Sequence, residues 1–409
     1  MDGTVTTKRA ADPAITILAV LATFMGMLAI WDSGYARAAV NNQILPREFW
    51  MQAIFALVSF FAAYVVYKIP TESWKKWAGV LIVATIGLLL LVEVPGIGKE
   101  INHAQRWIDL KIFLLQPAEF AKLSCILFLA VALAKRKPVA QLKKTPRHLG
   151  EKIDWLLVPW LKRAFPLIVV GFIIFFIEQE PDLATSMVIA FATFVMLVVG
   201  GVSRRSLAIL FIGSLLLVGG LTIKEPYRMA RITNHTERWS DTNIDGPGYQ
   251  TTQSEAALAR GGLFGVGLGN GLAKHRLPAP TTDFILATVG EEFGLVGSLV
   301  VVGLIAAIAL RMAALGMRRK DPFGRLVLVG LASWIGIQGA TNVMMANGFF
   351  PPIGIPLPFF SYGGSSLLAL WMGVGLAQNI LTETVVEKEV AIENRRNRRR
   401  DGWTRLPSS

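Results

Sequence analysis

The chain has 409 residues, of which 53% are hydrophobic and only 17% are charged, and its mean hydropathy is +0.50. This composition excludes an ordinary water-soluble globule and predicts a polytopic membrane protein. The net charge of +13 does not indicate nucleic-acid binding, because most of the excess lies in short segments between apolar runs. Anionic lipid headgroups and the retention of positive charge in the cytoplasm account for it there.

Ten apolar runs have the character of membrane-spanning helices. They lie at about 13–31, 49–67, 77–96, 116–134, 164–178, 183–203, 206–223, 284–310, 326–346 and 363–381. The sequence therefore predicts an all-α polytopic membrane protein with ten transmembrane helices. Residues 1–382 are expected to form one membrane domain, since no internal repeat or linker interrupts them. The Arg-rich segment 383–409 lacks apolar periodicity and is expected to be a basic cytoplasmic tail.

Lys and Arg collect in alternate segments between these runs, which predicts that those segments are cytoplasmic. The segments are 8–9, 75–76, 135–163, 204–205, 318–325 and 395–400. Both termini are therefore expected in the cytoplasm, and the first run is expected to remain as a membrane anchor. The polar segment 224–283 then forms a long extracytoplasmic loop between the seventh and eighth helices.

Two motifs precede and open the fourth run. In NHAQRWI, Arg106 and Trp107 lie at a membrane edge, where they act either as an interfacial anchor or as ligand-binding residues. In QPAEFAKLS, Glu119 and Lys122 are three residues apart and therefore share a helical face. Charges at that depth pair or meet a cavity, so we expect a salt bridge that also leaves Lys122 able to line a site for an anionic group.

The motif EQEPDLATS follows the fifth run, and its Pro181 and Asp182 are expected to cap the sixth helix. Near the end of the chain, Gln338 and Asn342 lie four residues apart on one face of the ninth run. The following FPPIGIPLPFFSYGGSS contains four prolines and is expected to form a rigid, non-helical loop.

The long segment 224–283 ends at Asp283, which brings a carboxylate to the start of the next apolar run. Long loops in compact proteins are usually functional, and an acid placed at a membrane is costly to retain. Asp283 is therefore a candidate functional residue. The four histidines have no metal-ligand spacing, and the single cysteine, Cys125, excludes an intrachain disulfide.

These motifs, together with GPGYQ, GGLFGVGLGNG, TTDFILATVGEEFG and GIPLPFFSYGGSSL, occur in one order and topology, and the chain resembles the SEDS family (shape, elongation, division and sporulation). The resemblance covers all ten runs. It implies a ten-helix peptidoglycan glycosyltransferase of the bacterial inner membrane that polymerises lipid II beside a class B penicillin-binding transpeptidase. GLGNG, Lys274 and the Gly-Glu-Glu after the TTDF motif are more similar to the division branch, which implies the septum.

The resemblance also implies roles for individual residues. The family's catalytic aspartate corresponds to Asp283, which suits a general base, since transfer from an α-linked lipid pyrophosphate to a β product inverts the anomeric centre. Thr281 stands where the family often has His, which argues against a proton relay there. The candidate substrate-binding residues are Arg106, Trp107, Glu119, Lys122, Arg228, Arg231, Gln338, Asn342 and Ser361.

No cofactor is required by the sequence and no metal ligand is certain, although Mg²⁺ or Mn²⁺ at the pyrophosphate stays open. The expected partners are lipid II, the transpeptidase, other membrane proteins of the division or elongation machinery, and membrane lipids, with no nucleic acid. Three alternative functions stay open. They are an elongation polymerase, a lipid II transporter or flippase, and a non-catalytic scaffold for cell-wall enzymes. The absence of an inverted repeat and the long external loop that ends in a lone acid argue against the transporter.

Overall fold

The computed structural model describes residues 11–40, 42–101, 104–111, 113–135, 149–224 and 226–382. The tail predicted at 383–409 lies outside these residues. A helix lies over every predicted apolar run: α1 Pro13–Val40, α2 Arg47–Lys68, α3 Thr71–Val92, α4 Pro117–Ala134, α5 Leu149–Gln179, α6 Leu183–Val199, α7 Arg204–Lys224, α11 Ile285–Met317, α12 Pro322–Ala346 and α13 Gly364–Thr382. The third helix ends at Val92, earlier than the expected residue 96.

Seven of these helices are long and apolar enough to cross a membrane, when the described residues are considered. They are α1, α2, α3, α4, α11, α12 and α13. The apolar parts of α5 (Ala164–Gln179) and α6 are shorter, and α7 is not among the seven. The structure therefore confirms a multi-pass membrane protein, whereas a total of ten crossings stays a prediction.

The expectation of an all-α fold is wrong in one place, because a small antiparallel sheet fills the segment between α3 and α4. Its strands are β1 Gly98–Ile101, β2 Ala104–Asp109 and β3 Leu114–Leu115, in the order β1-β2-β3. Strands of two to six residues are too short for their alternation to be visible beside long apolar runs. Lys99 of β1 pairs with Trp107, and Ile108 pairs with Leu115 of β3.

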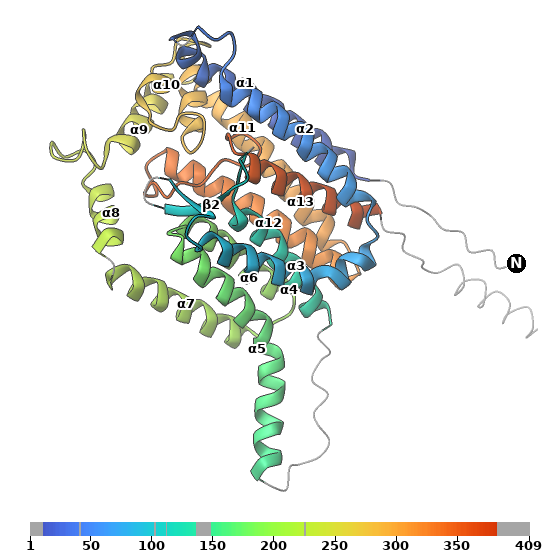
Figure 1. Ribbon diagram of the computed structural model, residues 1–409. Helices are drawn as coiled ribbons and strands as arrows, with labels where there is room; N and C mark the ends of the chain where they lie inside the picture. The colour runs from blue at the N-terminus through green and yellow to red at the C-terminus, as the bar shows by residue number, and fades with distance from the viewer. Residues whose placement is uncertain are drawn as a thin grey trace, which may run out of the picture.

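The segment 224–283 is not one irregular loop either. It contains α8 Pro226–Thr236, α9 Tyr249–Gly261 and the single turn α10 Ala273–Arg276. Figure 1 shows α7 and α8 at the edge of the molecule, with α9 and α10 leading back towards α1 and α11. Helices α7 and α8 therefore lie at the periphery of the bundle, and α9 and α10 connect them back to the bundle before Asp283 (Figure 1).

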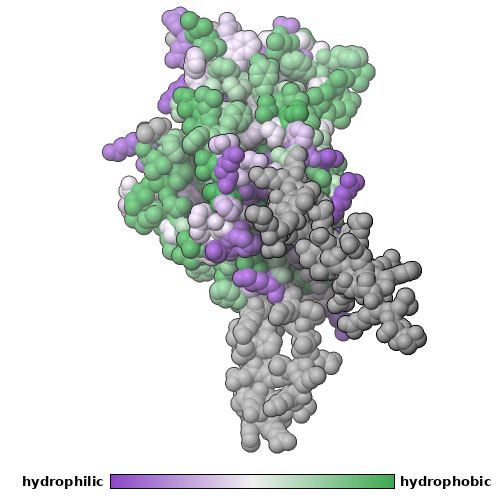
Figure 2. Space-filling view, turned by 90° about the vertical axis from the view of Figure 1, so that its right-hand side faces the viewer, coloured by the Kyte–Doolittle hydropathy of each residue, from purple (hydrophilic) through white to green (hydrophobic). Residues whose placement is uncertain are grey.

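The described helices divide into an inner and an outer group. About three quarters of the most apolar stretch of α4, α12 and α13 is buried (72%, 72% and 78%), against 28–33% for α1, α2, α3 and α11. Small residues permit the inner contacts: a Cβ at Gly330 of α12 would lie 2.7 Å from Ile126 of α4. Figure 2 shows hydrophobic residues over broad areas of one face, with hydrophilic residues gathered in separate clusters. Such a surface suits a lipid environment.

Candidate active site

The helices α4, α6, α11 and α13 begin at the same end of the bundle, and Asp283 lies directly before α11. Gln116, at the start of α4, donates from Nε2 to Asp182 Oδ2 before α6 (3.1 Å), and its backbone N–H donates to Ser365 Oγ in the first turn of α13 (3.0 Å). Asp182 caps α6 as predicted, since its Oδ1 accepts from the backbone N–H of Thr185 (3.0 Å). The first turns of α4, α6 and α13 are thus joined, and helix starts carry positive dipole ends.

The backbone of the Asp283 segment is held from the C-terminal third of the chain. Three successive carbonyls, those of residues 281, 282 and 283, accept hydrogen bonds from the Tyr362 N–H (2.8 Å), Ser361 Oγ (2.6 Å) and Asn342 Nδ2 (2.8 Å) respectively. Asn342 Nδ2 also donates to the Ile355 carbonyl (2.7 Å). The proline-rich loop and the start of α11 are therefore one hydrogen-bonded unit.

The carboxyl group of Asp283 is half-buried in this unit. A Cβ placed on Gly354 would lie only 3.6 Å from its Oδ2, so the proline-rich loop passes directly beside it. Burial raises the pKa of Asp283 from 3.8 to about 6, although the positive charge of Arg106 lowers it, and the charge of Asp182 raises it further. The carboxylate at neutral pH is thus more basic than an ordinary aspartate.

Arg106 joins the sheet to the turn before α6. Its Nε donates to the Glu180 carbonyl (2.8 Å) and its Nη2 donates to the Pro181 carbonyl. Trp107 is the next strand residue, and successive residues of a strand point to opposite faces. Arg106 and Trp107 therefore point to opposite faces of the sheet. The charge of Arg106 lowers the pKa of Asp283.

Glu180 is a member of this site that the sequence analysis did not single out. Its side chain is 1% exposed, and neither carboxylate oxygen has a hydrogen-bond partner among the described residues. Burial raises its pKa to about 9, with the charges of Asp182 and Glu93 adding to the effect and that of Arg106 opposing it. Glu180 is therefore a neutral acid at pH 7. Its position beside Asp182 in the EQEPD motif was the available signal.

The predicted pair of Glu119 and Lys122 is confirmed as a buried salt bridge, with Nζ 2.8 Å from Glu119 Oε1 and both side chains at most 3% exposed. Lys122 also donates to Gln338 Oε1 (3.0 Å), which accepts from Trp334 Nε1 (2.8 Å). Gln338 Nε2 in turn donates to the Pro356 carbonyl (3.0 Å). This cluster connects α4 and α12 to the proline-rich loop that borders Asp283.

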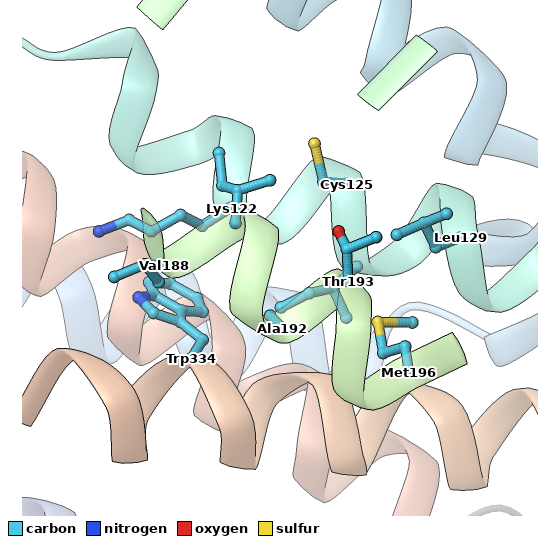
Figure 3. Close-up of a pocket in the computed structure, with 10 residues that line it drawn as sticks. Lys122, Cys125, Leu129, Val188, Ala192, Thr193, Met196 and Trp334 are labelled. Atoms are coloured by element: carbon cyan, nitrogen blue, oxygen red, sulfur yellow. The ribbon is translucent and has the colours of Figure 1, made fainter. Parts of the chain in front are cut away.

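A small cavity lies between α4, α6 and α12 beside this cluster. Figure 3 shows Lys122 and Trp334 together at one side of it, with Cys125, Thr193 and Met196 further along. Its lining is largely apolar and its volume is about 10 Å³, which is room for about one water molecule. This cavity is therefore too small to hold a lipid-linked disaccharide.

The remaining candidates lie elsewhere. Arg231 is a partly buried residue of α8, which packs against α7 and lies far to the side in Figure 1. The side chain of Arg228 lies outside the described part of the structure. Within the described residues, no group of three or more His, Cys, Asp or Glu side chains is placed to hold a metal ion.

Removing the Ser361 hydroxyl tests whether its hydrogen bonds stabilise the backbone next to Asp283. Ser361 is 6% exposed, donates to the residue 282 carbonyl and accepts from the Leu357 N–H (2.8 Å), so Ser361→Ala leaves two buried polar groups without a partner. We expect a loss of about 1–3 kcal/mol of stability and lower activity, measured by thermal melting and product formation. Ser333→Ala is the matched control, because Ser333 Oγ bonds only within its own helix, to the Val329 carbonyl. Equal effects of the two changes would contradict this interpretation.

A bundle of apolar helices with acidic and basic residues gathered at one end is the architecture of a multi-pass membrane protein. The family model described as "Cell cycle protein", FTSW_RODA_SPOVE, matches residues 13–385. The chain therefore belongs to the family of FtsW, RodA and SpoVE, and the resemblance inferred from its motifs is confirmed.

Several relatives are similar over nearly their whole length. The "probable peptidoglycan glycosyltransferase FtsW" of Trichlorobacter lovleyi is 33% identical over 90% of this chain and 92% of its own. The "stage V sporulation protein E" of Bacillus subtilis is also 33% identical, over 92% and 98%. Among solved structures, one described as "Structural coordination of polymerization and crosslinking by a peptidoglycan synthase complex" has a TM-score of 0.71 at 28% identity and covers 91% of this chain and 98% of that one. RodA of Thermus thermophilus has a TM-score of 0.62 at 27% identity and covers 91% and 97%.

Proposed function

We propose that the protein polymerises lipid II, transferring its glycan to a growing strand with inversion, and that Asp283 is the general base. The chain is an enzyme of the peptidoglycan glycosyltransferase class, as its curated relatives are named. The observation that carries the proposal is the half-buried Asp283, with its pKa raised to about 6, held at the joined helix starts within the field of Arg106. A base of that pKa is matched to neutral pH.

Inversion at the sugar requires two things of the protein. The acceptor hydroxyl must lose a proton to a base as it attacks, and the leaving pyrophosphate must gain stabilisation as its charge develops. Asp283 accepts the proton. Arg106 and the first turns of α4, α6 and α13 supply positive charge and dipole ends at the same end of the bundle, which suits the pyrophosphate.

The other candidate residues have supporting roles in this proposal. Gln338 and Lys122 shape the wall behind the proline-rich loop, while Asn342 and Ser361 hold the Asp283 backbone at the substrate's edge. Trp107, Arg228 and Arg231 are proposed as outer contacts for the glycan or lipid. A Mg²⁺ or Mn²⁺ ion at the pyrophosphate would neutralise part of its developing charge.

We further propose ten membrane crossings, cytoplasmic termini and an extracytoplasmic segment 224–283, from the distribution of Lys and Arg between the apolar runs. The complex described as coordinating polymerisation and crosslinking is similar to this chain over 91% of its length, which supports a class B penicillin-binding transpeptidase as partner. The relatives named FtsW support action at the division septum, and an elongation role is the second candidate because RodA is also similar.

The test is product formation by the purified full chain. Fluorescent lipid II in detergent, with the co-expressed transpeptidase blocked by penicillin, should give a glycan ladder on a gel. A transporter or scaffold predicts no polymer without a membrane gradient or a second polymerase. Absence of polymer with the partner present, at a protein concentration where the fold is intact, would overturn the proposal.

The pH dependence of the rate follows from the pKa of Asp283. The base must be a carboxylate, so the rate should be low in acid and rise as the pH passes about 6. Arg106→Ala removes the charge that lowers this pKa, so its acidic limb should move to higher pH, measured as initial rate from pH 5 to 8. Lys99→Ala, on the exposed pair with Asp109 of the same sheet, should leave the limb in place. An unmoved limb in Arg106→Ala would contradict the assignment.

A further inference from the structure

The segment 261–272, which joins α9 to α10, exposes an apolar surface. Its sequence, GGLFGVGLGNGL, contains no charged residue. The exposed large side chains are Leu263 (63%), Phe264 (79%), Val266 (40%), Leu268 (56%) and Leu272 (46%). A contiguous run of this kind on an extramembrane loop is unusual for a surface that only water covers.

The apolar side chains are exposed although the backbone of the loop is firmly held. The backbone of 261–267 pairs with α11 at its kink, where Gly294 has φ 67° and ψ −162° and is not helical. The N–H groups of Val266 and Gly267 donate to the carbonyls of residues 291 and 292 (both 3.0 Å), and the Leu295 N–H donates to the Gly262 carbonyl (2.9 Å). A φ of 67° favours glycine. The kink therefore frees backbone groups that the loop then satisfies.

Charged groups hold the rest of the loop from the inside. The Glu292 carboxylate accepts from the N–H groups of Gly269 (3.2 Å) and Gly271 (3.1 Å) and from Lys274 Nζ (2.7 Å). Lys274 Nζ also donates to Asp32 of α1 (2.9 Å). These polar contacts face inward and the five apolar side chains face outward, so the loop can enter an apolar medium without leaving these groups unpaired.

The position of the kink sets the depth of the loop. The part of α11 from Gly294 to Met317 is about 36 Å long at about 1.5 Å per residue, which is enough to cross a hydrocarbon layer of about 30 Å. If the crossing is made by this part of the helix, Gly294 lies at the edge of that layer, on the side of Asp283. The outer face of α11 continues the apolar surface at this level, with Phe293, Leu295, Val296 and Leu299 between 45% and 59% exposed.

We propose that the segment 261–272 is a membrane-interface anchor whose Leu263, Phe264 and Leu268 enter the lipid leaflet beside α11 and contact its acyl chains. Lipid is the occupant because the surface is continuous with the exposed apolar face of α11, a helix long and apolar enough to cross a membrane. Since the same loop is bonded to the first half of α11, which begins two residues after Asp283, the anchor fixes the depth of the site at the level of lipid headgroups. This last consequence rests on the proposed function.

The test uses a single-cysteine probe. Phe264→Cys in a Cys125→Ala background is labelled with an environment-sensitive NBD dye, and the purified full chain is reconstituted in phosphatidylethanolamine–phosphatidylglycerol vesicles with doxyl-labelled lipids. We expect blue-shifted emission and at least two-fold stronger quenching by a doxyl group near the glycerol backbone than by a soluble quencher. The control is Asp241→Cys, on the exposed polar part of the same long segment, which should show the reverse.

A second variant connects the anchor to activity. Replacing Leu263, Phe264 and Leu268 together by Asn should leave thermal melting in detergent unchanged and lower polymerisation in vesicles several-fold more than in detergent. A water-exposed probe at position 264, or quenching protection that requires the transpeptidase, would overturn the proposal. Because the probe reports on the inactive protein as well, loss of the polymerase assignment would not change its reading.

Discussion

Asp283→Asn should fold, enter the membrane and bind its partner while polymerising lipid II about 10² to 10⁴-fold more slowly than the wild type, the usual contribution of a general base. The amide keeps the shape of the side chain and cannot accept the proton. Asp283→Glu should recover only part of the rate, since the added methylene displaces the carboxylate by about one ångström from a geometry on which rate depends steeply. The measurement is glycan product from matched amounts of purified protein.

The stability of the same variant separates a lost base from a lost fold. Burial raises the pKa of Asp283 above its unfolded-state value, so its charge destabilises the folded state as the pH rises from 3.8 through about 6. Asp283→Asn removes that charge and should melt at the same or a higher temperature at pH 7. Asp245→Asn, an exposed acid of the same segment, should change neither rate nor melting. Near-equal product from wild type and Asp283→Asn would sink the assignment.

Lys122→Ala should destabilise the protein by about 3–5 kcal/mol, because it leaves the buried Glu119 carboxyl group without its cation. Gln338 also loses a donor at its Oε1. Removing both charges with Glu119→Ala and Lys122→Ala should recover part of this loss. The measurement is the melting temperature in detergent, with lipid II polymerisation as a second readout.

The exposed pair of Lys99 and Asp109 provides the control for this double change. Its N–O distance is the same, 2.8 Å, but its side chains are 47% and 39% exposed. Breaking it should leave the melting temperature nearly unchanged, because solvent screens an exposed ion pair. If the double change at Glu119 and Lys122 is no more stable or active than either single change, the two side chains do not act as a pair.

The features that could be predicted from the sequence are those formed by residues close together along the chain. Glu119 and Lys122 are three apart on one helix, Asp182 caps the helix that follows it, and helices cover the ten apolar runs. Each follows from helical periodicity or capping chemistry, which operate over a few residues. Local rules therefore predicted the elements and two of their polar contacts.

Long-range pairings were not predictable in the same way. Arg106 reaches the carbonyls of residues 180 and 181, and Ser361 reaches that of residue 282, yet neither sequence neighbourhood indicates the other. In the sequence, Glu180 is one of several polar residues in a turn. Its burial and raised pKa follow from the packing of distant elements around it. The sheet between α3 and α4 was missed for a different reason, because its strands of two to six residues are too short to show a clear alternation.

The hydrogen bonds that hold residues 281–283 come from residues 342, 361 and 362, which are synthesised at least 59 residues later than Asp283. A nascent chain inserted up to α11 therefore carries the proposed base without its supports. The site is completed only when the last two helices have entered the membrane and the proline-rich loop has closed over it. Biosynthesis thus imposes an order in which insertion precedes activity, and a chain truncated before Tyr362 would occupy the membrane without acquiring a functional site.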